Sequence, residues 1–264
     1  MIKDSLGDRM KSYYESVPRI SLVRRMPVAI RLDGAHFHSF TQGFKRPFDD
    51  ILVASIQQTM KSLCENIQGV VLGYCQSDEI TLILLDYMNL DTQAWFDYEV
   101  QKMVSTSASL ATLYFNRHFH SEVMRFTSQY MDFDTIYTEE ETNYIMAIEK
   151  AMNKGATFDS RCFNIPKEEV TNLIYWRQLD AIRNSILMVG QANYSPKGLL
   201  NKSCGEVKEM LLKEKGINWN ELSTHLQRGS CCIKGEQGWT IDTEIPTFKG
   251  DGREYIEKLI YIGE

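Results

Sequence analysis

The chain has 264 residues, a formal net charge of −6 and a hydrophobic share of 43%. This length admits one domain with added helices or two packed domains, and no segment reaches the roughly 18 consecutive apolar residues of a membrane helix. The acidic balance argues against a protein that coats nucleic acid with its whole surface. The N-terminus lacks a secretory signal and the six cysteines lack metal-type spacing, so we expect a cytoplasmic protein with reduced thiols and no membrane contact.

The first quarter of the chain alternates between predicted helices and strands. Apolar residues at helical spacing predict a leading helix over residues 4–17. Residues 27–34 (PVAIRLDG) alternate with a period of two, which predicts a strand with Asp33 near its end, on the face opposite the apolar row. A second helix is predicted over residues 49–67, with an aspartate cap at its start.

Two further strands follow as a tight hairpin. Residues 70–76 (VVLGYCQ) and 79–86 (EITLILLD) are apolar runs of strand length, and only Ser77 and Asp78 separate them. The remaining predicted elements are, in chain order, a helix over about 91–119, a less regular stretch over 130–158, a strand over 160–166, a helix over 166–190, two shorter helices within 204–227 and a β-hairpin over 228–246.

The order of elements from residue 27 to residue 165 is β-α-β-β-α-β, the ferredoxin-like order of an α+β fold. It places the first and third strands side by side in an antiparallel sheet with helices on one face. We therefore expect a catalytic domain with its leading helix over residues 1–165. A helical region with the C-terminal β-hairpin, over residues 166–264, is expected to pack on it. The topology also brings Asp33 and Asp78 to one edge of the sheet, although they are far apart in sequence.

Asp33 and Asp78 form a candidate site for a pair of Mg²⁺ ions. Hard cations prefer oxygen ligands and are usually held by one or two carboxylates together with substrate phosphates, and two such ions assist phosphoryl displacement. The carbonyl of Gly34 is a candidate further ligand. Glu79 is expected to support the catalytic pair without binding metal, since adjacent strand residues point to opposite faces. Asp-Gly and Ser-Asp are also common turn pairs, so the spacing alone leaves a purely structural role open.

Cationic and hydroxyl side chains elsewhere are candidates for holding a triphosphate. Arg31 shares the strand face of Asp33, and Lys102 lies on the following long helix, before Ser105 and Ser109. For each of these residues, an ordinary solvated position on the surface is the alternative.

Two HFH segments place histidines two residues apart, at 36–38 and 118–120. No third or fourth ligand is evident, so zinc is not favoured. Phe37 and Phe44 follow the first strand, where they either form a stacking surface for a base or pack in the core.

Three ordered motifs carry a family resemblance. They are RLDGAHFHSF from Arg31, YCQSDE from Tyr74 and WRQLDAIRN from Trp176, with FDSR from Phe158 lying between the last two. Over about residues 1–234 the chain resembles the tRNA-histidine guanylyltransferase family and its guanylyltransferase-like relatives, which are reverse-direction (3′-to-5′) polymerases. The matching positions are Arg31 to Gly34, Phe37, His38, Phe40, Tyr74, Gln76 to Glu79, Phe158, Asp159, Arg161, Trp176 to Gln178, Asp180 and Asn184.

The resemblance implies a polymerase-type palm built on the β-α-β-β-α-β order, with a helical region behind it. It implies two Mg²⁺ ions held by Asp33, the Gly34 carbonyl and Asp78. By the same resemblance the residues that bind GTP or ATP are Asp33, Gly34, Ala35, His36, Phe37, His38, Ser77 and Asp78. Family members activate the 5′-monophosphate of a tRNA with ATP or GTP, then let the 3′-hydroxyl of an incoming nucleotide attack it, and they assemble as tetramers.

Two departures from the family pattern bear on the substrate. Eukaryotic enzymes that add the extra guanylate to tRNA-histidine carry H-I-N-N in the third motif, where this chain has Ile182 in place of the histidine. They also carry an arginine where this chain has Ala35. The resemblance therefore favours repair of 5′-truncated tRNAs over recognition of tRNA-histidine. From the residues alone two alternatives stay open: a palm-type nucleotide cyclase acting on a free nucleoside triphosphate, and a non-catalytic RNA-binding module.

Overall fold

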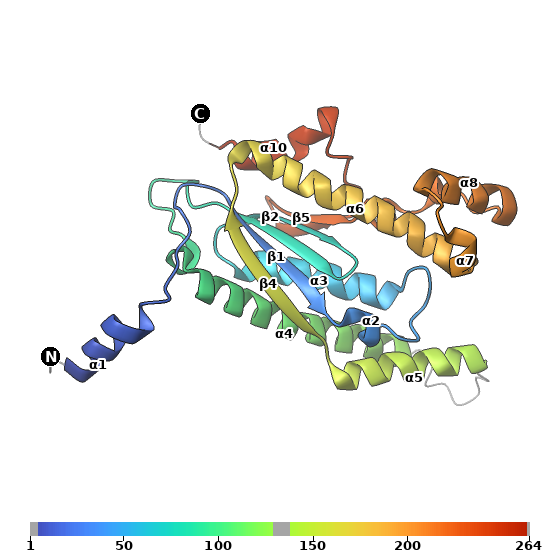
Figure 1. Cartoon of the computed structure of the whole chain (residues 1–264), viewed down its shortest axis with the longest axis horizontal. Coiled ribbons are helices and arrows are strands. Elements are labelled where there is room, and N and C mark those ends of the chain that lie inside the picture. The colour runs from blue at the N-terminus through green and yellow to red at the C-terminus, as the bar shows by residue number, and fades with distance from the viewer. Residues whose placement is uncertain (1–4, 129–137, 263–264) are drawn as a thin grey trace.

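The computed structural model describes residues 5–128 and 138–262 of the chain (Figure 1). At its centre is a six-stranded antiparallel sheet with the strand order β4-β1-β3-β2-β5-β6. The strands are β1 (Val28–Ala35), β2 (Val70–Gln76), β3 (Glu79–Leu84), β4 (Thr157–Asn164), β5 (Ser230–Gly235) and β6 (Gly238–Asp242). The predicted α+β class and the pairing of the first strand with the third are confirmed. The C-terminal β-hairpin extends the sheet beyond β2.

The α-helices are α1 (Ser5–Met10), α2 (Phe37–Phe40), α3 (Asp50–Asn66), α4 (Val100–Ser128), α5 (Glu139–Lys154), α6 (Lys167–Asn193), α7 (Pro196–Leu199), α8 (Cys204–Lys215), α9 (Thr224–Arg228) and α10 (Glu254–Ile260). Short 3-10 turns lie at Trp95–Tyr98, Trp219–Glu221 and Gly250–Arg253. Within the described ranges, no helix combines the length and the apolar character needed to cross a bilayer.

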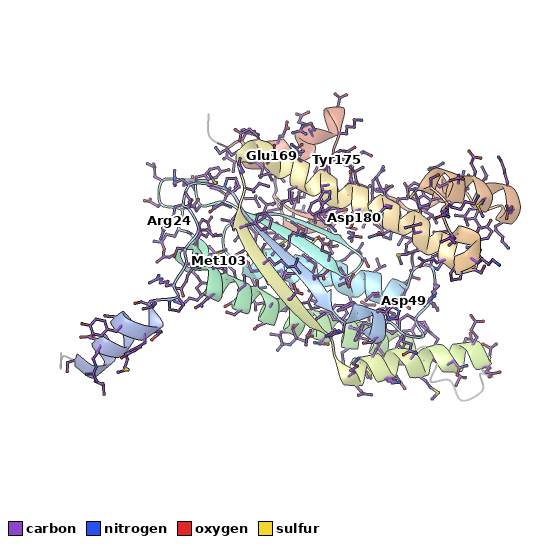
Figure 2. The ribbon with its side chains drawn as sticks, in the orientation of Figure 1. Arg24, Asp49, Met103, Glu169, Tyr175 and Asp180 are labelled. Carbon is purple, nitrogen blue, oxygen red and sulfur yellow. The ribbon has the colours of Figure 1, made fainter. Side chains whose placement is uncertain are left out.

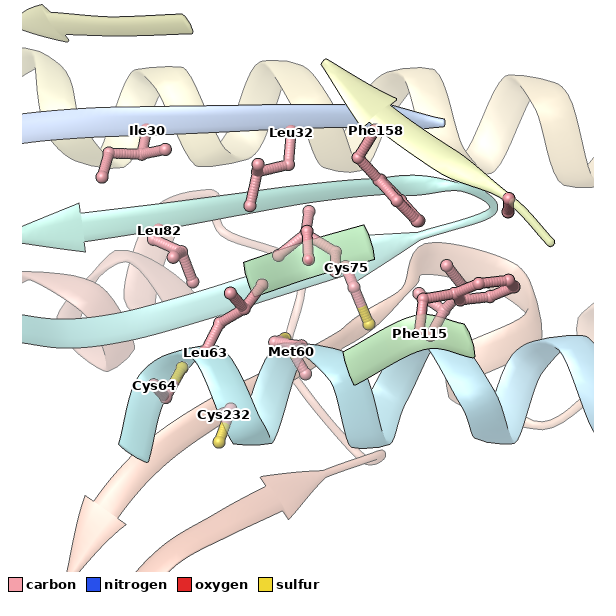
Figure 3. Packing of buried hydrophobic residues seen from close by; sticks show 14 of the residues in the cluster. Ile30, Leu32, Met60, Leu63, Cys64, Cys75, Leu82, Phe115, Phe158 and Cys232 are labelled. Atoms are coloured by element: carbon pink, nitrogen blue, oxygen red, sulfur yellow. The ribbon is translucent and has the colours of Figure 1, made fainter. Parts of the chain in front are cut away.

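Helices α3 and α4 cover one face of the sheet. Ile30 and Leu32 of β1 belong to the same buried apolar core as Met60 and Leu63 of α3 (Figure 3). Helix α3 begins where the carboxylate of Asp49 accepts a hydrogen bond at 3.0 Å from the backbone amide of the helix's third residue, which satisfies one of the free amides of the first turn. The predicted inward row of β1 and the aspartate cap are therefore confirmed.

Helices α6 and α10 pack on the opposite face. Ala29 and Ile83 of the sheet share a second apolar core with Val170 and Ile174 of α6 and with Ile256 of α10. The prediction of helices on one face holds for α3 and α4 but is wrong for the whole sheet, because α6 also presents apolar residues at helical spacing. The division into two domains at residue 165 stays a prediction.

Two predicted helices have other limits in the structure. The long helix begins at Val100 instead of near residue 91, because Phe96 and Asp97 hold left-handed backbone angles that a helix cannot contain. The predicted leading helix over residues 4–17 is divided into α1 and a π-helical turn (Lys11–Glu15), and neither has a buried residue.

The stretch predicted to be less regular contains a regular helix, α5. It begins with a capping box, in which the side chains of Thr138 and Glu141 each accept a backbone hydrogen bond from the other residue. Tyr144, Ile148 and Ala151 are its buried residues. The part of the predicted stretch over residues 130–137 lies outside the described residues.

Candidate active site

The end of β1 and the β2–β3 hairpin meet at one edge of the sheet. Asp33 of β1 is in register with Glu79, the first residue of β3. The backbone amide of Gly34 donates a hydrogen bond to the carbonyl oxygen of Asp78 at 3.2 Å. The fold therefore brings Asp33 and Asp78 together, as the β-α-β-β-α-β order requires.

The carboxyl group of Asp78 has an unusual electrostatic environment. Burial raises the pKa of Asp78 above its ordinary value, and the negative charges of Asp33 and Glu79 raise this pKa further. The hydroxyl of Ser77 donates to Oδ1 of Asp78 at 3.1 Å and favours the ionised form. Ser77 itself has a φ of 50°, which closes the two-residue turn. The charge of Asp33 is thus near enough to oppose ionisation of Asp78.

Gly34 and Phe37 form a tight contact next to these carboxylates. A Cβ at position 34 would lie 2.2 Å from Cδ2 of Phe37, so only glycine fits. The Phe37 ring is 5% exposed and packs within 5.3 Å of the ring centres of Phe115 and Phe158. Phe37 is therefore packed in the core, but it also lines the cavity described below, so its contact with a base stays a prediction.

The residues between Gly34 and Phe40 turn the chain away from β1. His36 adopts a left-handed φ of 58°, and its carbonyl accepts hydrogen bonds from the backbone amides of Ser39 and Phe40. Ala35 is partly exposed, whereas the side chains of His36 and His38 are exposed. Of the residues between Gly34 and Phe40, Phe37 and His38 line the cavity described next.

A cavity of about 440 Å³ opens beside Ser77 and Asp78, a size common among small-molecule sites. The loop before α3 forms one wall and supplies Lys45 and Arg46, both exposed, while Met188 and Gln191 of α6 form another. Phe44 also lines it but is buried against Phe40 and Phe119. Lys45 and Arg46 belong to the basic residues of the first 50 positions, an uneven charge distribution that is compatible with a local phosphate-binding surface, but the sequence did not assign them to the site. The available signal was a short basic run between the first motif and the cap of the next helix.

Glu79 binds two arginines on the α6 side of the sheet. Its Oε1 accepts from Nε and Nη2 of Arg31 at 3.2 and 3.1 Å, and its Oε2 accepts from Nη2 of Arg177 at 2.6 Å. Since directly paired residues of neighbouring strands share a face, Glu79 lies on the same face as Asp33. The expectation that it points away from the catalytic pair is therefore wrong. Arg31 does share the face of Asp33, but its guanidinium is already paired.

Lys102 lies far from the two aspartates within one chain. It is in the first turn of α4 and pairs with Glu99 at 3.3 Å. Helix α4 reaches the end of β1 only near Thr112, whose Oγ1 accepts from the amide of Phe158, the register partner of Gly34. Ten residues of helix span about 15 Å.

Figure 2 agrees with this placement, because Met103, the neighbour of Lys102, and Asp49, beside the cavity, are labelled at opposite ends of the sheet. The prediction that Lys102 binds the same triphosphate as Asp33 and Asp78 is wrong for a single chain. The hydroxyls of Ser105 and Ser109 bind carbonyls of their own helix.

The donor atoms near Asp33 and Asp78 suit a hard cation. Two carboxylates and backbone carbonyls are oxygen ligands, and Mg²⁺ typically keeps several waters and substrate oxygens beside one or two carboxylates. Over residues 5–128 and 138–262, no group of three or more His, Cys, Asp or Glu side chains could hold a metal by itself. His118 bonds to Ser62 instead. The residues present therefore fit magnesium shared with a phosphate substrate.

Known proteins resemble the chain over nearly its whole length. A family model described as tRNAHis guanylyltransferase matches residues 7–166. A solved bacterial tRNA(His) guanylyltransferase-like protein in complex with ATP is 42% identical, with a TM-score of 0.81, and the match covers 98% of this chain and 100% of that one. A second structure, of such a protein in complex with GTP, has 39% identity, a TM-score of 0.75 and the same coverage. A probable tRNA(His) guanylyltransferase of Dictyostelium discoideum is 25% identical over 257 residues, which are 92% of this chain and 88% of that protein.

Proposed function

Because the chain belongs to the tRNAHis guanylyltransferase family and is therefore a nucleotidyltransferase, we propose that it adds nucleotides to the 5′ end of tRNA in the 3′–5′ direction. The observation that carries this proposal is the meeting of Asp33 and Asp78 beside a cavity of nucleotide size with basic residues in its wall. The 5′ end would first be activated by ATP or GTP, after which the 3′-hydroxyl of the incoming nucleotide would attack it.

Two Mg²⁺ ions are part of the proposal. Asp33, the carbonyl of Gly34 and Asp78 would hold them, and the bound ions would neutralise charge on the phosphates during the displacement. Glu79 is proposed as a positioning residue: its two arginine partners fix the start of β3, and with it the hairpin that carries Asp78. The low-dielectric surroundings of Asp78 strengthen its attraction to any cation.

The nucleoside triphosphate is proposed to lie in the cavity beside Ser77 and Asp78. Two bacterial relatives were solved in complex with ATP and with GTP, which supports a nucleoside triphosphate as the ligand. Lys45 and Arg46 would offer positive charge to the phosphates, and His38 faces the same space. Ala35 and His36, which directly follow the proposed metal ligands Asp33 and Gly34, would bind the nucleotide through their backbone groups.

General repair of 5′-truncated tRNA is proposed ahead of guanylate addition to tRNA-histidine. Ile182 is partly buried and packs with the apolar cluster around Ile186 and Trp219 of the helical region. An aliphatic side chain in this position offers no hydrogen bond to a nucleobase, so it cannot provide the contact that a histidine offers there.

The proposal includes a homotetramer and a cytoplasmic location. Assembly is inferred from the family resemblance alone. The location is supported by six free cysteines, of which Cys64, Cys75, Cys231 and Cys232 are buried, because such thiols are typical of reducing compartments.

The test is extension of a 5′-truncated tRNA with each nucleoside triphosphate in turn, in the presence of Mg²⁺. Incorporation that follows the opposing base is expected. Asp33→Ala and Asp78→Ala should each lower the rate roughly 100-fold or more, because bound metal supplies several kcal/mol of transition-state stabilisation. Asp91→Ala, at an exposed aspartate outside the cavity, serves as the matched control and should retain the wild-type rate.

Other outcomes would replace the proposal. Addition of guanylate alone, restricted to tRNA-histidine, would indicate maturation of that tRNA instead of repair. A cyclic product from GTP without any RNA would establish the cyclase alternative. Full extension by both aspartate variants would show that the metal site lies elsewhere.

A further inference from the structure

One tryptophan of the chain is exposed on the α6 side of the sheet. Trp176 is 52% exposed, whereas Trp95 and Trp219 are 8% and 7% exposed and Trp239 is partly buried. An exposed indole is costly unless something covers it in the working state. Trp176 belongs to α6, whose Tyr175 and Asp180 are labelled in Figure 2.

The indole of Trp176 is held in place by charged neighbours. The guanidinium carbons of Arg31 and Arg177 lie 5.3 and 4.4 Å from the ring centre. Both arginines are anchored on Glu79, and Arg177 also bonds to Asp180 at 2.9 Å. The ring is therefore a fixed surface supported by cation–π contacts, with about half of its area still open to solvent.

This surface lies next to the proposed reaction centre. Arg31 precedes Asp33 by two residues on the same strand face, a separation of about 7 Å. On the outer side, Arg31 is in register with Arg161 of the edge strand β4. The ring of Trp176 thus contacts Arg31, and Asp33 is the next residue along β1 whose side chain lies on the same face as Arg31.

Exposed arginines lie on the strand and the helix beside Trp176, β4 and α6. The side chains of Arg161 and Arg183 are 64% and 62% exposed. Asp159 lies 3.5 Å from Arg161 but is itself half exposed, and Asp180 is shared between Arg177 and Arg183. In a chain with a net charge of −6, this is a local site for a polyanion.

We propose that Trp176 stacks on a nucleobase at the 5′ end of the RNA, next to the phosphate that reacts at Asp33 and Asp78. The inference rests on the proposed function and names a positioning residue for its RNA substrate. An open surface at the sheet edge can accept the end of an RNA chain, because the rest of the chain can continue into solvent. The free nucleoside triphosphate is proposed to bind in the cavity beside Asp78 instead. Stacking is tolerant of base identity, which suits an enzyme that accepts 5′ ends of different sequence.

The first experiment is RNA binding followed by tryptophan fluorescence, with a 5′-truncated tRNA as the probe. Stacking of a base on the exposed indole should quench wild-type emission. Trp176→Ala should abolish that change. Filter binding, which does not depend on the indole, should show a Kd for the RNA raised roughly 5- to 150-fold in Trp176→Ala, while Trp176→Phe, which keeps an aromatic face, should restore most of the affinity. Leu212→Ala, at a 53% exposed apolar residue of α8, is the matched control and should bind as the wild type does.

The second experiment separates RNA from nucleotide in the steady state. Trp176→Ala should raise KM for the tRNA and leave KM for the nucleoside triphosphate unchanged. Unchanged RNA affinity in Trp176→Ala would overturn the inference, as would quenching by ATP or GTP alone. So would quenching that depends on protein concentration without RNA, since that would indicate a second copy of the chain on the surface.

The two proposals fail in different ways. If the wild type binds RNA with quenching but incorporates no nucleotide, the polymerase reaction is wrong and the stacking surface stands. If the wild type extends RNA and Trp176→Ala does so with the same KM, the reaction stands and the surface is wrong. Far-ultraviolet circular dichroism of the Phe and Ala variants establishes that each is folded.

Discussion

At the scale of single residues, the contact between Gly34 and Phe37 links the core to the reaction centre. The ring fills the space that any side chain at position 34 would need, and the same ring packs on Phe115 and Phe158. The glycine of the first motif is therefore explained by packing, independently of any ligand.

Gly34→Ala is expected to lower the free energy of unfolding by about 1–3 kcal/mol, because the new methyl group must displace a ring in a packed core. Urea denaturation measures the change. Gly205→Ala is the control: position 205 lies in the first turn of α8, where an added Cβ meets only Oγ of Ser203 at 4.0 Å. Equal effects of the two substitutions would contradict the packing argument.

The ion pairs of Glu79 could not be predicted from the sequence. Its ionic partners Arg31 and Arg177 lie 48 and 98 residues away in the chain. No local pattern encodes such pairings, whereas the strand that carries Glu79 was evident from its apolar residues. A family motif marked Arg177 as important without indicating that it contacts Glu79.

Glu79→Gln is expected to lower the free energy of unfolding by about 1–3 kcal/mol, because the guanidinium of Arg177, with a side chain 7% exposed, loses one of its two charged partners and keeps only Asp180. Lys213→Gln removes one partner of a pair whose side chains are more than 70% exposed and should leave stability unchanged. Chemical denaturation of both variants gives the comparison. A Glu79→Gln protein as stable as the wild type would show that this ion pair contributes nothing net.

At the scale of elements, the strands and the largest helices followed from periodicity, and the exceptions have physical causes. Helix α5 was missed because its sequence is mostly polar, although its few apolar residues, among them Tyr144, Ile148 and Ala151, lie on one buried face. The start of α4 was placed too early because nothing local signals the left-handed backbone of Phe96 and Asp97. Lys102 was placed in the site because the direction of a helix relative to the sheet is a tertiary property.

The packing of α4 on α3 contains a pH-sensitive contact. Nε2 of His118 lies 2.9 Å from Oγ of Ser62. Burial lowers the pKa of His118 from its ordinary value of 6.5, and Glu122 and Glu65 oppose this change only in part. Because the folded protein prefers the neutral ring, the stability that this contact provides is fully present above pH 6.5 and is lost as the pH falls through the lowered pKa.

His118→Gln is therefore expected to lose less stability than the wild type between neutral pH and about pH 5. Melting temperatures measured across that range test this expectation. His120→Gln is the control, since His120 is exposed on the other side of the same helix, and its pH profile should follow the wild type. Parallel profiles for all three proteins would contradict the role of His118.

At the scale of the whole molecule, folding itself brings the carboxylates together. The register of β1 with β3 and the hydrogen bond from Gly34 to the Asp78 carbonyl allow no other arrangement. The topology was predictable from the order of elements, and with it the approach of Asp33 to Asp78. The part of the cavity wall that α6 forms was not predictable from the order of elements. It depends on how α6, which follows the four strands of this order in sequence, packs on the other face of the sheet.

Magnesium is expected to raise the melting temperature of the wild type, because a cation that binds only the folded chain stabilises it. At 100 times Kd the gain is about 2.7 kcal/mol, or roughly 5–10 °C for a protein of this size. Differential scanning calorimetry with and without a chelator measures it. Asp78→Asn should lose most of the rise, and an equal rise in that variant would contradict the assignment of the ligands.

The pairing of β1 with β3 thus has a consequence beyond catalysis. Every folded molecule must hold two negative charges close together, and an unfolded one need not. If magnesium binds at Asp33 and Asp78 as proposed, folding and cation uptake are thermodynamically linked, and each shifts the equilibrium of the other. The free magnesium concentration would then set the fraction of molecules that are folded, in addition to the proposed role of the ion in the reaction.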